Sequence, residues 1–174
     1  MEMNSKERRQ AIVIKLKEID KPIKGTELAK GFGVSRQIIV QDIALLRAQG
    51  ITIMATPHGY VMLKKDNTKI TKTIVSKHNT CKEMEEELQI MIDHGARVID
   101  VIVEHPIYGE IKGILDISYK KELEEFMEKV KKDKAEPLSS LTEGVHIHTV
   151  EVPDEETFKE MEKALIKKGY LINE

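Results

Sequence analysis

The stretch from Gly25 to Gly50, GTELAKGFGVSRQIIVQDIALLRAQG, constrains the fold more than any other part of this chain. It predicts a short helix, a glycine-containing turn and a second helix that begins after Ser35, whose hydroxyl suits an N-cap. On the second helix Ile39, Ile43 and Leu46 recur at helical spacing and form a stripe that we expect to be buried. This order of elements is the one that places a helix in the major groove of DNA.

The side of the second helix that faces away from this stripe predicts contact with DNA. Arg and Gln side chains make bidentate contacts with base edges, and Val packs on the methyl group of thymine. The other interpretation is a helix-turn-helix that contacts only proteins, but an Arg/Gln face favours DNA. We therefore expect DNA contacts from Ser35, Arg36, Gln37, Val40 and Gln41.

Two short predicted strands, 51–55 and 60–63, flank a turn at residues 56–59 that contains Pro and Gly. With a helix predicted over residues 5–20, they indicate a winged helix. His58 lies at the tip of the wing and is a candidate for contact with phosphate or the minor groove. The alternative is an exposed turn histidine without a functional role.

Charge divides the chain into two parts. Residues 1–65 contain 12 Lys and Arg against 6 Asp and Glu, whereas residues 66–174 contain 16 basic and 24 acidic residues. The basic part holds the helix-turn-helix, as attraction to phosphate requires. The polar connector KKDNTKI at 64–70 predicts a boundary between a winged helix-turn-helix domain at 1–64 and a second domain at 70–174.

Targeting signals and cysteine usage indicate the cellular setting. The N-terminus lacks the apolar segment of a signal peptide and no apolar run is long enough to cross a bilayer, so we expect a cytoplasmic protein without a membrane partner. The single cysteine, Cys81, suits a reducing compartment. We expect it to be a packed thiol on the side of a helix that also carries Met84 and Leu88, rather than a redox switch.

The second part of the chain predicts a domain of the α+β class. Strands alternate with helices in the order βαββαβαβ, which suggests a ferredoxin-like regulatory domain with one mixed sheet and its helices on one face. The predicted strands are 71–77, 97–104, 110–117, 145–152 and a terminal one at 170–172, and the predicted helices are 80–93, 119–132 and 154–168.

The segment VHIHTVEV carries the most specific chemical signal of this domain. His146 and His148 are two residues apart on a predicted strand, so both imidazoles project from one face about 7 Å apart and can bind one ion. The alternative, two solvated histidines on an open sheet face, is equally compatible with the pattern. His78, at the end of strand 71–77 and just before a helix, is a third candidate ligand.

Helical phase indicates which carboxylate can complete such a site. Glu87 borders the apolar face of its helix beside Leu88, whereas Glu86 points almost opposite that face. We therefore expect Glu87 to reach round toward His78, and Glu85 and Glu86 to be solvated. Three imidazoles and one carboxylate suit a divalent transition metal, with Zn or Ni ahead of Co or Fe(II), rather than Ca or Mg.

Two further histidines have weaker signals. His105 lies where an apolar strand enters a turn and is a candidate ligand-binding residue; the alternative is a turn histidine that is hydrogen-bonded to the backbone. His94 precedes Gly95 at a predicted helix C-terminus, where a cation suits the helix dipole, so we expect it to cap that helix.

Taken together, several segments resemble the nicotinic-acid-responsive transcriptional repressors of NAD biosynthesis. The segments are VSRQIIVQDIALLRAQG, TPHGYV, RVIDVIVEHPIYGEIKG, AEPLSSLTEGVHIHT and PDEET, and the likeness covers nearly the whole chain. The resemblance implies a helix-turn-helix joined to a three-histidine domain. It also implies a metal held by His78, Glu87, His146 and His148, with nicotinic acid as corepressor.

On this interpretation the chain is a homodimeric repressor, not an enzyme, that binds double-stranded operator DNA near genes for NAD synthesis or nicotinate uptake. Two alternatives stay open: a regulator that senses the metal itself, and a metalloenzyme domain fused to a DNA-binding domain. The sequence offers no convincing constellation of nucleophile and general base beside the expected metal, and no phosphate-binding glycine loop, which weighs against the enzyme.

Overall fold

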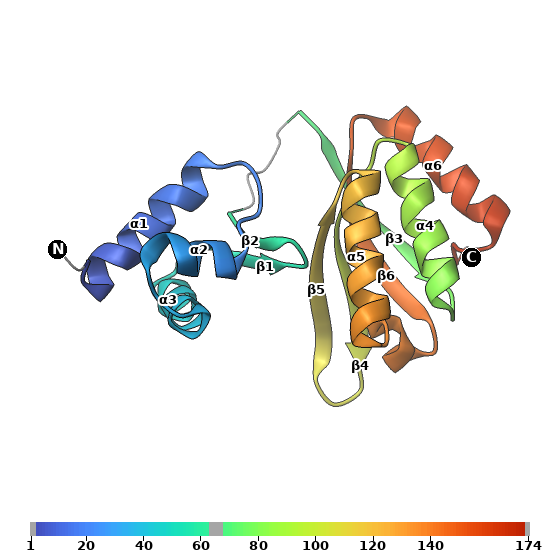
Figure 1. Ribbon diagram of the computed structural model, residues 1–174. Helices are drawn as coiled ribbons and strands as arrows, with labels where there is room; N and C mark the ends of the chain where they lie inside the picture. Colours follow the sequence, from blue (N-terminus) through green and yellow to red (C-terminus); the bar gives the residue numbers. More distant parts are fainter. Residues whose placement is uncertain (1–2, 63–67, 173–174) are drawn as a thin grey trace. The chain divides into compact units, whose positions relative to one another are not determined.

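The structure is a computed structural model that describes residues 3–62 and 68–172. The chain divides into two compact units, Met1–Lys65 and Asp66–Glu174, and each has its own hydrophobic core (Figure 1). Most of the predicted connector at 64–70, and Leu63 at the end of a predicted strand, lie outside the described residues.

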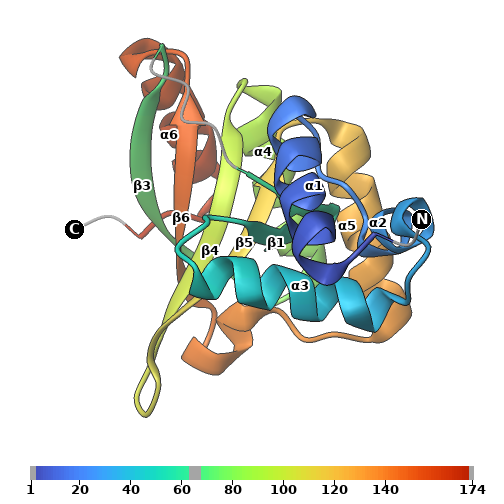
Figure 2. The same ribbon diagram turned by 90° about the vertical axis from the view of Figure 1, so that its left-hand side faces the viewer.

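The N-terminal unit is a helical domain with a short hairpin (Figure 2). Its elements are α1 (Ser5–Glu18), α2 (Gly25–Phe32), α3 (Arg36–Ala48), β1 (Met54–Thr56) and β2 (Gly59–Val61). Ser35 caps α3 by accepting a hydrogen bond from the Ile38 amide, as predicted. The predicted stripe of Ile39, Ile43 and Leu46 is buried and joins the core of this unit.

The hairpin β1–β2 is shorter than predicted, and a third segment pairs with it, which the sequence did not indicate. Ile23, in the connection between α1 and α2, forms a bridge with Tyr60 through backbone hydrogen bonds of 2.9 and 2.8 Å. Gly59 makes this approach possible, because a Cβ there would overlap the Ile23 carbonyl and lie 2.8 Å from the Lys24 nitrogen. The wing is therefore tied to the helices by backbone contacts.

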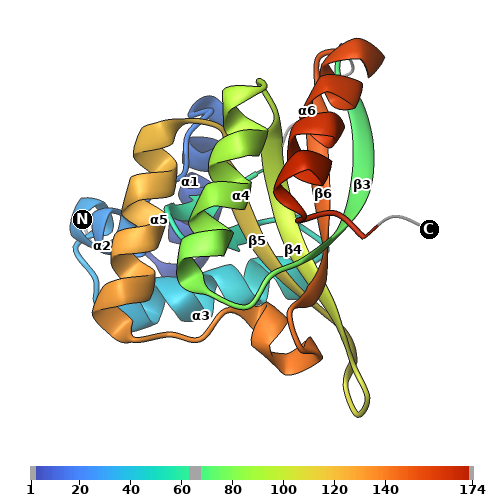
Figure 3. The same cartoon turned by 90° about the vertical axis from the view of Figure 1, so that its right-hand side faces the viewer.

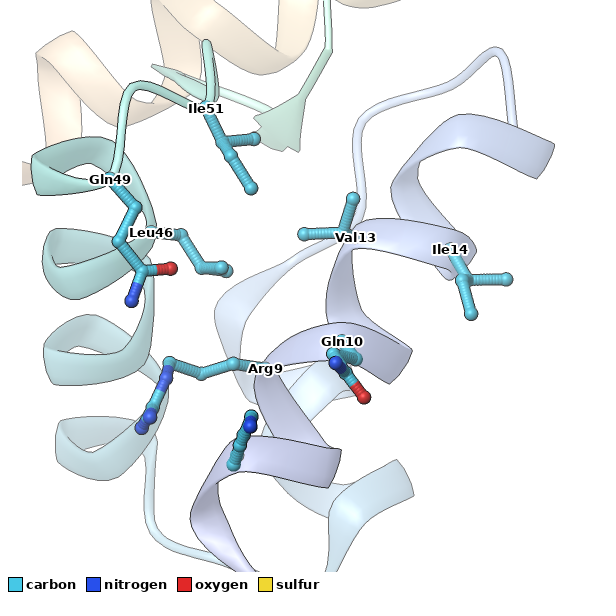
Figure 4. Close-up of a pocket in the computed structure, with 8 residues that line it drawn as sticks. Arg9, Gln10, Val13, Ile14, Leu46, Gln49 and Ile51 are labelled. Carbon is cyan, nitrogen blue, oxygen red and sulfur yellow. The ribbon is translucent and has the colours of Figure 1, made fainter.

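An open groove of about 480 Å³ lies between α1 and the end of α3 (Figure 4). Its lining mixes basic and amide side chains with apolar ones, and it contains none of the predicted metal ligands. The lining residues are Lys6, Arg9, Gln10, Val13, Ile14, Leu46, Gln49 and Ile51.

The C-terminal unit packs three helices on one face of a four-stranded sheet (Figures 1 and 3). Its elements are β3 (Ile70–Lys77), α4 (Cys81–Asp93), β4 (Arg97–His105), β5 (Gly109–Ile117), α5 (Lys120–Asp133), the 3₁₀ helix η1 (Leu138–Thr142), β6 (Val145–Val152) and α6 (Glu155–Lys168). The predicted α+β class is confirmed, and the predicted order βαββαβαβ is confirmed up to its last helix, α6.

The prediction of a mixed sheet is wrong. The strand order is β3-β6-β4-β5, and every pair of neighbours is antiparallel. The helix α4 connects β3 to β4, but these two strands are not neighbours in the sheet. Strand β6 lies between them and runs antiparallel to both. The predicted terminal strand at 170–172 is reduced to a single bridge between Leu171 and Ser76, beside the edge strand β3.

The face of the sheet opposite the three helices carries an apolar row. Val75 on β3 lies opposite Ile147 on β6, which lies opposite Ile102 on β4. These residues alternate along their strands with residues that face the helices. In the described part of this unit, α4, α5 and α6 all lie on the other face (Figure 3).

Candidate metal centre and DNA-binding surface

Four side chains from three elements meet between the sheet and α4. His146 and His148 project from β6 on the face that the helices cover, because alternate residues of a strand share a face. His78 follows the last residue of β3, and Glu87 comes from the middle of α4. The structure thus brings together all four residues that the sequence analysis named as metal ligands.

The three imidazoles converge on one carboxylate oxygen. Glu87 Oε2 lies 2.7 Å from His78 Nε2, 3.2 Å from His146 Nε2 and 3.5 Å from His148 Nε2. The cluster is buried, since Glu87 is 0% exposed and its most accessible member, His78, is 5% exposed. The alternative of two solvated histidines on an open sheet face is therefore wrong.

Backbone carbonyls orient two of the rings. His146 Nδ1 donates to the Gly144 carbonyl at 2.8 Å, and His148 Nδ1 donates to the Asp100 carbonyl at 2.6 Å. Each ring therefore turns its Nε2 atom toward Glu87. A neutral imidazole that donates from Nδ1 has a lone pair at Nε2, which is the arrangement found in histidine ligands of metals.

Burial and charge oppose each other at Glu87 and His148. Burial raises the pKa of the Glu87 carboxyl, but attraction to His148 and hydrogen bonds from the three imidazoles outweigh it and hold this pKa well below its usual value. Burial lowers the pKa of His148, but the Glu87 carboxylate more than compensates and raises it. The two shifts together favour an ionised Glu87 carboxylate beside a protonated His148 ring.

The donor set fits a divalent transition metal. Ligand atoms of His78, Glu87 and His146 lie within 4.8 Å of one another, and His148 Nε2 borders the same carboxylate. Within the described part of the chain, the buried Glu87 Oε1 has no hydrogen-bond partner. A buried anionic oxygen without a partner is costly, and a bound cation would compensate it. The buried hydroxyl of Ser76, opposite His146 in the β3–β6 ladder, likewise lacks a partner among these residues, and the sequence analysis did not anticipate it.

Two acidic residues of α4 lie differently from their predicted positions. Glu87 does not reach round from the border of the buried face but belongs to it, with Met84, Leu88 and Met91. Glu86 is not simply solvated, because its carboxylate accepts hydrogen bonds from Lys168 and from the Tyr170 hydroxyl. Glu86 therefore links α4 to the last residue of α6 and to the segment that follows it.

The prediction for Cys81 is wrong, because its thiol is exposed. Cys81 has the helical phase of Met84 and Leu88, but it is the first residue of α4, where the helix end lies in solvent. The helical period predicts the direction in which a side chain points. It does not predict whether other parts of the fold extend far enough to cover that side chain.

The two remaining histidines of this unit have local roles in the backbone. His94 caps α4, as predicted, by donating from Nδ1 to the Ile90 carbonyl at 2.8 Å. His105 Nδ1 accepts hydrogen bonds from the amides of Ile107 and Tyr108 in the β4–β5 turn. His105 is therefore not part of the metal cluster, and its contacts correspond to the turn alternative.

The expected DNA-contacting face of α3 is available in the N-terminal unit. Arg36, Gln37 and Gln41 are exposed, Val40 is half-buried, and Ser35 serves as the N-cap. His58, in the turn of the wing, is half-buried rather than exposed.

Sequence reasoning missed Asp42, a buried carboxylate on α3. It accepts a hydrogen bond from Arg8 at 2.6 Å and lies 3.4 Å from Arg9 Nη1. The ion pairs hold α3 against α1, and the helical phase that Asp42 shares with Ile39 and Leu46 was a signal of its burial.

Two known domain families match this chain, one in each of its two units. An HTH domain matches residues 8–61, and a 3H domain matches residues 71–174. A probable transcription repressor, NiaR, of Thermotoga maritima is 46% identical over 168 residues, which cover 97% of this chain and 95% of that protein. The transcription repressor NadR of Bacillus subtilis is 40% identical over 170 residues, covering 96% of this chain and 94% of that protein. Among the described residues, no helix is long and apolar enough to span a membrane.

Proposed function

Because this chain belongs to the family of transcription repressors that join an HTH domain to a 3H domain, we propose that it represses genes of NAD biosynthesis and nicotinate uptake in response to nicotinic acid. Its relatives are named as repressors, in agreement with the expectation that it is not an enzyme. A repressor acts on chromosomal DNA, and we place it in the cytoplasm.

The DNA partner is an operator read by the exposed side chains of α3. One recognition helix contacts few base pairs, so a specific repressor needs two helices on half-sites related by two-fold symmetry. We assign dimer formation to the C-terminal unit, whose sheet face opposite the helices carries Val75 and Ile147 in register. Val75 is 41% exposed in the single chain and would be covered in the dimer.

The observation that carries the regulatory part of this proposal is the convergence of three Nε2 atoms on the buried carboxylate of Glu87. His78, Glu87, His146 and His148 would hold a Zn or Ni ion. When bound, the ion supplies an electrophilic anchor for the carboxylate or the ring nitrogen of nicotinic acid. The four side chains would fix its position, and the Glu87 carboxylate would offset part of its charge.

Nicotinic acid can act as a corepressor only if it binds the DNA-competent state better than the other states. A ligand shifts an equilibrium by its difference in affinity and by nothing else. We propose that binding at the cluster stabilises one arrangement of the two recognition helices in the dimer. The proposal that nicotinic acid strengthens repression, and does not relieve it, rests on the resemblance to nicotinic-acid-responsive repressors.

The depth of the cluster favours a second candidate, a regulator that responds to the metal itself. None of the four ligands is more than 5% exposed, so the site resembles a closed metal site more than an open pocket. In this case the operator affinity would follow metal occupancy, and nicotinic acid would have no effect.

Metal analysis and calorimetry test the regulatory site directly. The purified protein should contain about one Zn or Ni per chain, with histidine nitrogens about 2.0–2.1 Å from the ion by X-ray absorption. His78→Ala and His148→Ala should lose the metal and the binding of nicotinic acid together. A wild-type protein that binds nicotinic acid equally well after complete metal removal would contradict the anchor.

A further inference from the structure

A β-bulge in β4 lies directly beside the strand that carries two of the histidines. The register between β4 and β6 shifts between Val98 and Asp100, so that Ile99 is an extra residue on β4. Bulges of this kind change the direction in which backbone and side-chain groups point, and they occur beside functional sites. Here the extra residue comes two positions before Val101, which lies opposite His148.

The side chain of Asp100 takes the place of a backbone acceptor at this bulge. Its Oδ1 accepts the hydrogen bond of the Thr149 amide at 2.9 Å, and its Oδ2 lies 3.7 Å from Lys112 Nζ. The carbonyl of the same residue points to the other side and accepts from His148 Nδ1 at 2.6 Å. One residue thus holds β6 through its side chain and the His148 ring through its carbonyl.

The burial of Asp100 shows that these contacts are not incidental. The residue is 3% exposed, although it lies on the sheet face that the helices leave uncovered. A buried carboxylate requires hydrogen bonds or a nearby cation, and Asp100 has both. The His146 ring, by contrast, is held by the Gly144 carbonyl and has no contact with Asp100 among its described hydrogen bonds.

We propose that Asp100 is a positioning residue for the metal centre, whose carboxylate locks the bulge so that its own carbonyl holds His148 with Nε2 toward Glu87. This inference rests on the proposed metal site, but it makes a separate statement about the metal-free protein. Without the side chain, the bulge would be free to shift and the His148 ring would lose its orienting acceptor. Residues that orient metal ligands typically change metal affinity about 10–100-fold when they are replaced.

The test compares Asp100→Ala with Asp100→Asn, which keeps an Oδ1 acceptor for the Thr149 amide. In the metal-free protein, NMR should show a slowly exchanging Nδ1 proton for both His146 and His148. Asp100→Ala should lose the His148 signal and keep the His146 signal, and Asp100→Asn should keep both. Zinc affinity, measured by competition with a chelator, should fall about 10–100-fold in Asp100→Ala and be largely restored in Asp100→Asn.

The outcomes separate this inference from the proposed function. If the wild-type protein shows both protected protons but binds no zinc, the metal site fails and the positioning of His148 stands. A protected His148 proton and unchanged zinc affinity in Asp100→Ala would overturn the inference. Loss of both histidine signals in Asp100→Ala would also overturn it, because the variant would then disturb the whole unit. Should Asp100→Ala not fold, a wild-type protein without a protected His148 proton would still refute the proposal.

Discussion

Replacing Gly144 with alanine should damage the metal centre more than an ordinary glycine substitution would. Gly144 has φ +91, and a Cβ there would overlap the His78 carbonyl oxygen and lie 2.7 Å from Asn79 Oδ1. Its own carbonyl accepts hydrogen bonds from the His78 amide at 3.3 Å and from His146 Nδ1 at 2.8 Å. The backbone must therefore move, and it will carry His78 and His146, two of the proposed metal ligands, with it.

The matched control is Gly95→Ala, which has φ +79 but nothing within 4 Å of the new Cβ. Both variants bear the cost of a left-handed alanine, about 1–2 kcal/mol. Gly144→Ala also weakens two hydrogen bonds, each worth about 0.5–1.5 kcal/mol, so we expect it to lower the free energy of unfolding by about 2–5 kcal/mol in total.

Urea unfolding of the metal-free protein, followed by the amide resonances of β3 and β6, measures this difference in the C-terminal unit alone. We also expect zinc affinity to fall at least tenfold in Gly144→Ala and to stay near the wild-type value in Gly95→Ala. Equal losses of stability in the two variants, with equal zinc affinities, would refute the claim that a Cβ at Gly144 displaces the backbone of His78.

The remaining predictions concern DNA contacts, ligand identity and pH. Arg36→Ala and Gln37→Ala should each weaken operator binding by about 1–3 kcal/mol in fluorescence anisotropy and affect random DNA less; equal losses on both DNAs would mean backbone contacts only. Glu87→Gln should weaken metal retention in dialysis, whereas Glu86→Gln should not, because Glu86 contacts Lys168 and Tyr170 instead. Metal occupancy should fall as the pH is lowered, because a protonated imidazole cannot bind a metal. Burial lowers the pKa of His148, but Glu87 raises it by more, so this pKa lies above its usual value. The loss of metal should therefore begin at a higher pH than expected for a free imidazole, and a metal occupancy that does not change with pH would contradict this.

The features that the sequence predicted well are decided by neighbours along the chain. Ser35 caps α3 through the amide of Ile38, three residues away, and His94 caps α4 through the carbonyl of Ile90, four residues away. His146 and His148 are two residues apart, so they must share a face of the sheet if their segment forms a strand. Local rules were sufficient for these features because no distant residue is needed to satisfy them.

The features that the sequence missed depend on distant parts of the chain. The contacts of Glu86 with Lys168 and Tyr170 join residues more than 80 positions apart. The burial of Glu87 depends on the sheet beneath α4, and the strand order depends on β6 entering between β3 and β4. Periodicity can place a side chain on the border of a face, but only the tertiary packing decides whether that border is covered.

The bulge at Asp100 shows the same limit within one strand. The segment RVIDVIVEH predicts a continuous strand, and nothing in its pattern marks Ile99 as an extra residue. The bulge appears only in the pairing with β6, where the Asp100 side chain finds the Thr149 amide. The sequence therefore predicted the four residues of the cluster but not the groups that orient their side chains.

The most direct test of the central claim is the operator affinity of the metal-loaded protein as a function of nicotinic acid concentration. The account predicts an increase of roughly 5–150-fold, the usual range of coupling between two binding sites. The double variant His78→Ala/His148→Ala should keep the basal affinity, since the winged helix has its own core, and should show no increase. An operator affinity that does not change with nicotinic acid in the wild-type protein, or that still rises in the metal-free double variant, would contradict the account.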